Sequence, residues 1–345
     1  MENKVSKKLH IEMLRIIAVV MVVLNHSDLY YTYYTNTDNI FTFTVSLLIS
    51  CICKVNVPLF MMITGALLIP KAENWELILT KRVSRMVIVL VSFSALIYGL
   101  KCFAWHQDIF SVEGFLRKLL TGEIQTSYWY LYEYIGILMM LPFLGAIARN
   151  IDKNCVKYFV IIGMIFKISL PIVCFLTGYS FSLNLFVLEN SVFYVLMGYF
   201  AERIITDEQC EQGSCGKVIV GLIICIFITA GLVLIDKNRN GEYHEYILNM
   251  LTPVMVLFIY MGTRIIFIQH HPVRTAGIIC CLGSCAFGVY LLEHIGQKVF
   301  LNLYLWLTEK TYGIIACSVY VFCILISCFA CTMILKKVKI IRKLL

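Results

Sequence analysis

The chain has 345 residues, of which 60% are hydrophobic and 14% are charged, and its mean hydropathy is +0.83. Soluble domains carry about 25% charged residues, so this chain has too few polar side chains to cover a water-soluble surface. The composition excludes a cytosolic enzyme, a secreted domain and a disordered chain. It predicts an all-α, polytopic membrane protein.

Charged residues separate apolar stretches of about 20 residues, the length that a helix needs to cross a bilayer. Pro58 is expected to kink or break the second of these stretches, which also contains Lys54. Gly65 follows in the same stretch, so the segment indicates either an interrupted helix around a site or close packing through small residues. We expect ten spans: 9–30, 41–69, 86–105, 128–148, 156–177, 186–204, 218–235, 246–268, 277–301 and 312–335.

The distribution of Lys and Arg predicts the orientation of the chain. With these spans, 20 basic residues fall on the side of the termini and five on the opposite side. The 20 include Arg264, counted with the loop after the eighth span. Basic residues favour cytoplasmic loops, so both termini are expected in the cytoplasm. The net charge of +8 then reflects topology and anionic lipid rather than nucleic acid.

The 15 cysteines all fall in predicted spans or cytoplasmic loops. In an apolar helix a thiol behaves as a small hydrophobe, which is how we interpret Cys328 and Cys331. Cys210 and Cys215 share a loop without the second ligand pair that a zinc site needs. We therefore expect neither a disulfide nor a metal site.

The first span contains two polar residues, Arg15 and His26, eleven residues apart. Eleven helical residues turn by about 1100° and rise by about 16 Å, so both side chains point to the same side. Arg15 would lie toward the cytoplasmic end and His26 toward the far side. Either Arg15 reaches the lipid headgroups and His26 ends the helix, or the two residues line a cavity.

Arg82 and Arg85 lie three residues apart where the third span begins, so they are neighbours on one helix face. A guanidinium group binds phosphate with two parallel hydrogen bonds, which suits this pair to a phosphorylated ligand. The alternative is an ordinary cytoplasmic anchor, and charge alone favours that alternative.

Two further stretches place polar residues inside spans. Residues 128–134 include Trp129, which is typical of an interfacial aromatic belt, and Glu133, which is expected to face the bundle interior. The ninth span contains Glu293 and His294, for which a structural network and a site lining are both open.

Taken together, these residues resemble the acyltransferase-3 family of integral membrane O-acyltransferases. The family has Arg-x10-His in the first span and Arg-x-x-Arg entering the third, as Arg15/His26 and Arg82/Arg85 do here. Looser family stretches are matched by three segments: Val57–Gly65, Tyr128–Leu131 and Tyr290–His294.

Two departures from the family pattern concern the acceptor pocket more than the chemistry. Thr64 stands where the family usually has Ser, and Ser127-Tyr128 precedes Trp129 where His-Leu is common. The resemblance covers nearly the whole chain. It implies one membrane domain over residues 1–345, with a helical core at about 9–335 and no appended soluble domain.

The resemblance implies that acyl-CoA, usually acetyl-CoA, binds from the cytoplasm and that its acyl group reaches an acceptor hydroxyl on the far side of a bacterial plasma membrane. Arg15, Arg82 and Arg85 would hold the phosphates of coenzyme A. His26 would take the proton of the hydroxyl, and Arg15, on the same side of the helix, would be the second catalytic residue. The acceptor would be an envelope glycan or a small molecule. Four residues would contact substrate: Trp129, Glu133, Glu293 and His294.

Two other functions fit parts of the pattern. A transporter or flippase for an anionic, lipid-linked substrate would also have a basic inner mouth and a Pro/Gly-broken helix. It predicts inverted repeats, which the sequence does not show. A structural or sensor protein would pair its buried charges with one another. Turnover of acetyl-CoA by the purified protein separates the enzyme from both.

Overall fold

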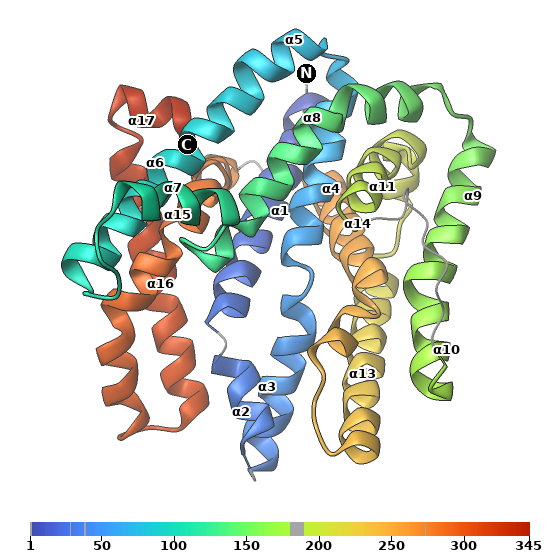
Figure 1. The fold of residues 1–345 in the computed structure, drawn as a ribbon. Helices are drawn as coiled ribbons and strands as arrows, with labels where there is room; N and C mark the ends of the chain where they lie inside the picture. The colour runs from blue at the N-terminus through green and yellow to red at the C-terminus, as the bar shows by residue number, and fades with distance from the viewer. Residues whose placement is uncertain (1, 28, 38, 180–189, 273) are drawn as a thin grey trace. The chain divides into compact units, whose positions relative to one another are not determined.

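The computed structural model describes residues 2–27, 29–37, 39–179, 190–272 and 274–345. The described residues are helical almost throughout and contain no β-strand (Figure 1). Nine helical segments within these ranges are long and apolar enough to cross a membrane. The predicted all-α, polytopic membrane fold is confirmed.

Helix α1 spans Glu2–His26 and α15 spans Ala276–Thr308; both are continuous. The other elements follow in chain order: α2 (Leu29–Thr35), α3 (Ile40–Cys53), α4 (Asn56–Leu68), η1 (Ile69–Lys71), α5 (Trp75–Leu77), η2 (Ile78–Val83), α6 (Ser84–Gly99), η3 (Leu100–Ala104), α7 (Val112–Thr121), η4 (Thr126–Tyr128), α8 (Trp129–Asn150), α9 (Lys153–Met164), η5 (Ile165–Ser169), α10 (Leu170–Thr177), α11 (Asn190–Ile204), α12 (Asp207–Glu211), α13 (Cys215–Asn240), η7 (Glu245–Asn249), α14 (Thr252–His270), α16 (Gly313–Leu335) and α17 (Lys339–Leu344).

Most predicted spans end within a few residues of the observed helices. The sixth, 186–204, begins outside the described residues, and its described part is α11. The third differs most, because the helical segment begins at Trp75 rather than at residue 86 and therefore includes Arg82 and Arg85. Long basic side chains can carry their charge to the membrane surface, so a charged residue need not end the helix.

The second span is interrupted, as its Pro58 predicts. Helix α3 ends at Cys53, Lys54 caps it, and α4 begins at Asn56. Pro58 lies in the first turn of α4, where the missing N–H costs no helical hydrogen bond. The break therefore lies just before the proline and leaves Lys54 in the middle of the 32-residue segment Ile40–Lys71.

Close packing through a small residue occurs in the same span. A Cβ atom on Gly65 of α4 would lie 1.7 Å from the carbonyl oxygen of Val195 in α11. A Cβ atom on Gly198 of α11 would lie 1.9 Å from the carbonyl oxygen of Met62. The two backbones touch, so any side chain at either glycine would force these helices apart.

The chain forms two compact units. The first comprises Met1–Leu67 and Ile151–Thr332, and the second comprises Leu68–Asn150 and Met333–Leu345. In the first unit α1 packs against α15, α14 and α3, and α13 packs against α14 and α3. In the second unit α6 packs against α7, α8 and α17.

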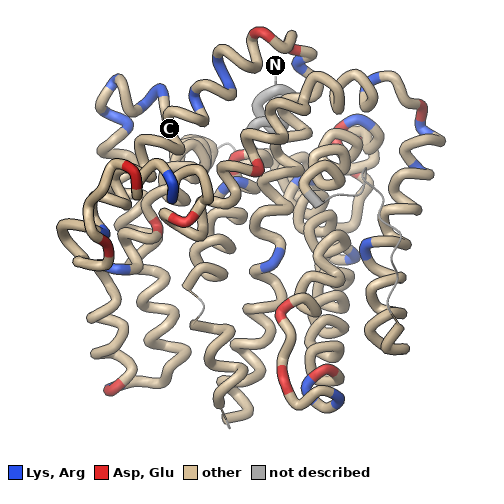
Figure 2. Tube along the Cα trace, viewed as in Figure 1, with Lys and Arg blue, Asp and Glu red and all other residues tan. Residues whose placement is uncertain are grey.

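Most charged residues lie at helix ends and in connections (Figure 2). Arg264 does not: it lies inside α14 and its side chain is only 1% exposed. Its assignment to a loop was therefore wrong. The charge is tolerated at depth because the carboxylates of Glu202 and Asp207 lie beside it.

The 15 cysteines are free thiols, and many of them are buried among apolar side chains. Within the described ranges, no group of three or more His, Cys, Asp and Glu side chains could hold a metal ion.

Candidate functional site

Helices α1 and α15 run side by side in the same direction. A Cβ atom on Gly283 of α15 would lie 2.5 Å from Oε2 of Glu12 in α1, so the backbone of α15 touches α1 there. Near the last turn of α1, His26 reaches Glu293. Glu12 and His26 are 14 residues apart, close to four full turns, and so lie on the same side of α1. This packing holds the polar residues of α1 against α15.

His26 and Glu293 form a hydrogen-bonded pair through Nδ1 and Oε1. The imidazole is 19% exposed, whereas the carboxylate is 1% exposed. The other oxygen of Glu293 is buried and has no hydrogen-bond partner among the described residues. A buried carboxylate against Nδ1 fixes the orientation of the ring.

A second contact holds the same turn of α1. Gln297, one turn after Glu293, donates from Nε2 to the carbonyl oxygen of His26 at 3.1 Å. The hydroxyl of Tyr320 in α16 donates to the carbonyl oxygen of Gln297 at 3.0 Å. The backbone and the side chain of His26 are thus both bound to α15, which leaves the ring little freedom.

Arg15 and His26 belong to one uninterrupted helix, so the predicted spacing is realised. Arg15 donates from Nη1 to Oε1 of Glu12 at 2.6 Å, three residues earlier. Oε2 of Glu12 is buried and lacks a hydrogen-bond partner in the described part of the chain. An anionic ligand would have to compete with Glu12 for the Arg15 guanidinium.

Arg82 and Arg85 lie on consecutive turns in the second unit, and each guanidinium fork binds oxygen. Arg82 donates from Nε and Nη2 to the two carboxylate oxygens of Glu73. This hydrogen bonding lowers the pKa of Glu73 below its usual value. Arg85 donates from Nε and Nη2 to the carbonyl oxygen of Leu344 at 3.1 and 2.9 Å. Both arginines already show the two-pronged geometry that suits a phosphate.

The remaining predicted site residues are divided between the units. Trp129 and Glu133 lie on α8 of the second unit, where Trp129 is 49% exposed and Glu133 is half-buried. His294 is half-buried beside Glu293 on α15 of the first unit. Of the four predicted substrate contacts, Glu293 forms a hydrogen bond with His26.

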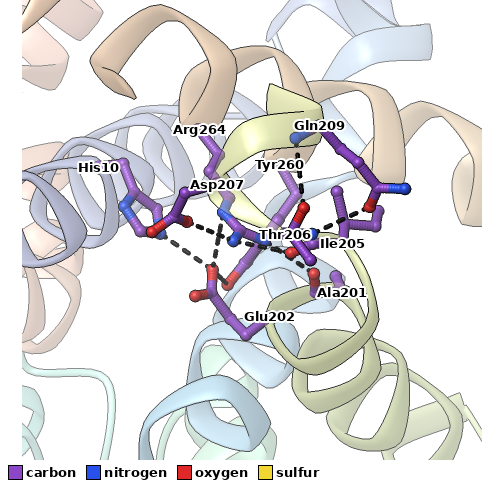
Figure 3. Close-up of polar contacts among 9 residues, drawn as sticks. All are labelled: His10, Ala201, Glu202, Ile205, Thr206, Asp207, Gln209, Tyr260 and Arg264. Carbon is purple, nitrogen blue, oxygen red and sulfur yellow. Dashed lines mark hydrogen bonds and ion pairs between the residues drawn. The ribbon is translucent and has the colours of Figure 1, made fainter. Parts of the chain in front are cut away.

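A buried polar cluster that the sequence analysis did not predict surrounds Glu202 (Figure 3). Oε1 of Glu202 lies 3.0 Å from Nε2 of His10 and accepts a hydrogen bond from the Tyr260 hydroxyl at 2.9 Å. Arg264 donates from Nη2 to Asp207 at 2.9 Å. One feature of the sequence could have indicated this cluster: Glu202 is an acidic residue inside the sixth predicted span, and such residues are rarely without a role.

Arg264 also closes the end of α11. It donates to the carbonyl oxygens of Ala201 at 2.8 Å and Ile205 at 2.9 Å, groups that the last helical turn leaves without helical partners (Figure 3). The cluster thereby connects α1, α11, α12 and α14. Its geometry is that of a packing element, because the carbonyls and carboxylates together use most of the guanidinium donors.

The structure is that of an all-α, multi-pass membrane protein with a histidine–carboxylate pair within its spans. The sequence matches the family model of an acyltransferase domain over residues 9–336, and the chain belongs to the acyltransferase-3 family. No curated protein and no solved structure matches the chain. The protein is therefore a multi-pass membrane acyltransferase, an enzyme that transfers acyl groups.

Proposed function

We propose that this enzyme transfers an acetyl group from cytoplasmic acetyl-CoA to a hydroxyl of an envelope glycan on the far side of a bacterial plasma membrane. The observation that carries this proposal is the pairing of His26 with the buried Glu293. Acyl transfer to a hydroxyl needs a base, and a neutral imidazole held by a carboxylate is a common one at neutral pH. A transporter or flippase remains the second candidate for the fold, but family membership favours the enzyme.

In the proposed reaction Nδ1 of His26 keeps its proton and donates a hydrogen bond to Oε1 of Glu293, which leaves the basic lone pair on Nε2. Nε2 takes the proton of the acceptor hydroxyl while the oxygen attacks the thioester carbonyl. The new C–O bond forms, the C–S bond breaks, and the departing sulfur takes the proton back from the imidazolium. Glu293 stabilises the transient positive charge on the ring.

We assign donor binding to Arg15, Arg82 and Arg85. Coenzyme A carries several phosphates, and a phosphate oxygen pair can replace the carboxylate of Glu73 in the fork of Arg82. The same exchange applies to Arg15, whose present partner is Glu12. We further propose that the whole chain works as one membrane domain. No metal has a role in this scheme.

Three further residues are proposed to contact substrate: Trp129, Glu133 and His294. Trp129 offers an exposed aromatic face, and the half-buried Glu133 and His294 offer polar groups at depth.

The direct test uses the purified protein in lipid vesicles with acetyl-CoA labelled in the acetyl group. We expect the label to be released as acetate without acceptor and to appear as a base-labile ester when envelope glycan is added. Absence of both reactions, together with movement of a lipid-linked sugar across the vesicle membrane, would support the transporter instead.

The proposed sidedness has a separate test. Single cysteines at Asn36 and Asn240, in a background without the native cysteines, should react with a membrane-impermeant thiol reagent in whole cells. Cysteines at Asn154 and Gly213 should be protected. The reverse pattern would place the termini outside and remove the basis for a cytoplasmic donor. Asn184, a further outer position by the predicted topology, lies outside the described residues.

A further inference from the structure

The break in the second span places a charged group near the end of α1. Lys54 caps α3 in the middle of the apolar segment Ile40–Lys71, and its side chain is only 11% exposed. Its Nζ donates to Oδ1 of Asn25 at 2.9 Å and forms an ion pair with Glu245. A lysine at this depth needs such partners, because an unpaired ammonium group in an apolar setting is costly.

A cavity of about 340 Å³ lies beside these three groups. Ligand pockets usually have volumes of about 300–1,000 Å³, so the cavity can hold a small ring. Its wall includes Asn25, Tyr30, Tyr31, Lys54 and Glu245. All of them belong to the first unit, as does His26.

The cavity and the proposed base share one helical turn. Asn25 immediately precedes His26 in the last turn of α1. Lys54 holds the side chain of Asn25, while Glu293 and Gln297 hold the ring and the carbonyl group of His26. The end of α1 is therefore fixed from two sides, by α15 and by the break in the second span.

The chemistry of the wall favours an uncharged, polyhydroxylated ligand. Glu245 balances the charge of Lys54, so this part of the cavity has no net charge for an ionic ligand. The carboxylate of Glu245 is 64% exposed and can accept hydrogen bonds from hydroxyl groups. Tyr31 supplies aromatic surface for the C–H face of a sugar ring, whereas Tyr30 is only 4% exposed and closes the wall behind it.

We propose that this cavity binds a neutral sugar ring of the acceptor, with Asn25, Lys54 and Glu245 as its polar contacts. The inference rests on the proposed function, because it assigns the hydroxyl that His26 deprotonates to a ligand held here. An anionic acceptor would instead draw Lys54 away from Glu245. Removing the charge of Glu245 would then increase acceptor binding rather than weaken it.

The test uses Lys54→Met, which keeps the aliphatic stem, and Glu245→Gln, which keeps the shape of the carboxylate. Each variant is expressed in cells that lack the native gene, and base-labile acetate is measured in the isolated envelope glycan. We expect about a tenfold to hundredfold loss for each, the effect of removing a charged hydrogen bond. Hydrolysis of acetyl-CoA by the purified variants, measured without acceptor, should fall by less than the ester content does.

The matched control is Lys118→Met, which breaks the ion pair of Lys118 with Asp108 in the other unit and should leave the ester content unchanged. If Lys54→Met fails to accumulate in the membrane, Glu245→Gln gives the test alone, because its carboxylate is largely exposed.

Four results separate the possibilities. Wild-type ester content in both variants would overturn the sugar cavity. A gain with Glu245→Gln and a loss with Lys54→Met would overturn the neutral sugar in favour of an anionic acceptor. A loss of acetyl-CoA hydrolysis as large as the loss of ester in both variants would reassign the residues to positioning of His26. Absence of base-labile acetate in cells with the wild-type enzyme would contradict the proposed function itself.

Discussion

The membrane-spanning part of helix α1, Leu9–His26, carries a histidine–glutamate pair at each end. The two pairs differ in burial and in the number of groups that bind the carboxylate. His10 is completely buried, and its partner Glu202 also binds Tyr260 and lies 3.9 Å from Arg264. His26 is partly exposed, and among the described contacts the imidazole is the one hydrogen-bonding partner that Glu293 has.

This difference is our reason for proposing a packing role for the first pair and a chemical role for the second. A carboxylate that accepts hydrogen bonds from several donors is held in place by all of them. A buried imidazole cannot contact a substrate. A partly exposed imidazole that is the one hydrogen-bonding partner of a carboxylate can contact an acceptor and take a proton from it. A histidine beside a glutamate is therefore not enough to indicate catalysis. The number of other groups that bind the same glutamate must also be known.

The largest expected effect is that of His26→Ala. If His26 is the base, transfer should fall by about 10²–10⁴-fold, the usual contribution of a positioned base. Donor binding and membrane insertion should persist, because Ala is well tolerated in a helix. The measurement is ester formation from labelled acetyl-CoA, with the dissociation constant of acetyl-CoA determined on the same preparation.

His294→Ala is the control for His26→Ala, since it removes the neighbouring imidazole on α15. A larger loss with His294→Ala than with His26→Ala would move the catalytic role to α15. An active His26→Ala protein would leave the pair without a chemical function.

Glu293→Gln should have the next largest effect. Glutamine can still accept the hydrogen bond of Nδ1, but it cannot stabilise an imidazolium ion by charge. Losing a hydrogen bond to a charged group costs roughly 1.5–3 kcal/mol, which is about a tenfold to hundredfold decrease in kcat. The KM for acetyl-CoA should not change. A change in KM with an unaltered kcat would show that Glu293 serves the donor and not His26.

Replacing Arg82 and Arg85 together by Ala should weaken donor binding and spare the chemistry of the His26 pair. We expect the dissociation constant of acetyl-CoA to rise by about tenfold to hundredfold, since charged hydrogen bonds are lost. Lysine at both positions should restore only part of the affinity, because it lacks the planar fork. Unchanged donor affinity in a folded double variant would show that the two arginines only anchor the helix.

Glu73→Gln tests the same site in the opposite direction. The pKa of Glu73 is lowered by its hydrogen bonds with Arg82, so the ion pair is fully present above the ordinary carboxyl pKa and is lost as the pH falls through the lowered value. At neutral pH the carboxylate of Glu73 would compete with a phosphate of acetyl-CoA for the guanidinium of Arg82. Removing it should tighten acetyl-CoA binding by about two- to fivefold, the range of a partly exposed ion pair. Weaker binding in this variant would instead make Glu73 a support of the Arg82 fork.

The sequence predicts the spans well because each depends only on a local run of apolar residues. It also predicts Arg15 and His26 as one helical pair, since their spacing along a continuous helix fixes their relation. It does not identify Glu293 as the partner of His26, because that contact joins residues 267 positions apart. A local pattern contains no information about which distant carboxylate a helix will face.

Because a local pattern does not reveal distant partners, the sequence analysis misplaced Arg264 and did not predict the partner of Lys54. Arg264 was counted with a loop because basic residues usually end spans, yet distant carboxylates allow it to lie inside α14. Lys54 was expected inside a span, but its partner Glu245 is 191 residues away and was not predicted. Buried charges are thus recognisable from the sequence as unusual, whereas their partners require the folded chain.

The smallest effect on transfer is expected for His10→Ala. Glu202 keeps its hydrogen bond with Tyr260 and the nearby Arg264 charge, so the carboxylate is not left alone. Loss of one buried hydrogen bond should lower the free energy of unfolding by roughly 1–3 kcal/mol, which a lower unfolding temperature in detergent would report. Transfer per folded molecule should stay close to that of the wild type, because the pair of His26 with Glu293 lies at the other end of α1.

His10→Gln, whose amide can donate to Glu202, should recover part of the lost stability. If His10→Ala instead abolished transfer in a protein that unfolds at the wild-type temperature, the buried pair would belong to the reaction, and the distinction between the two ends of α1 would fail.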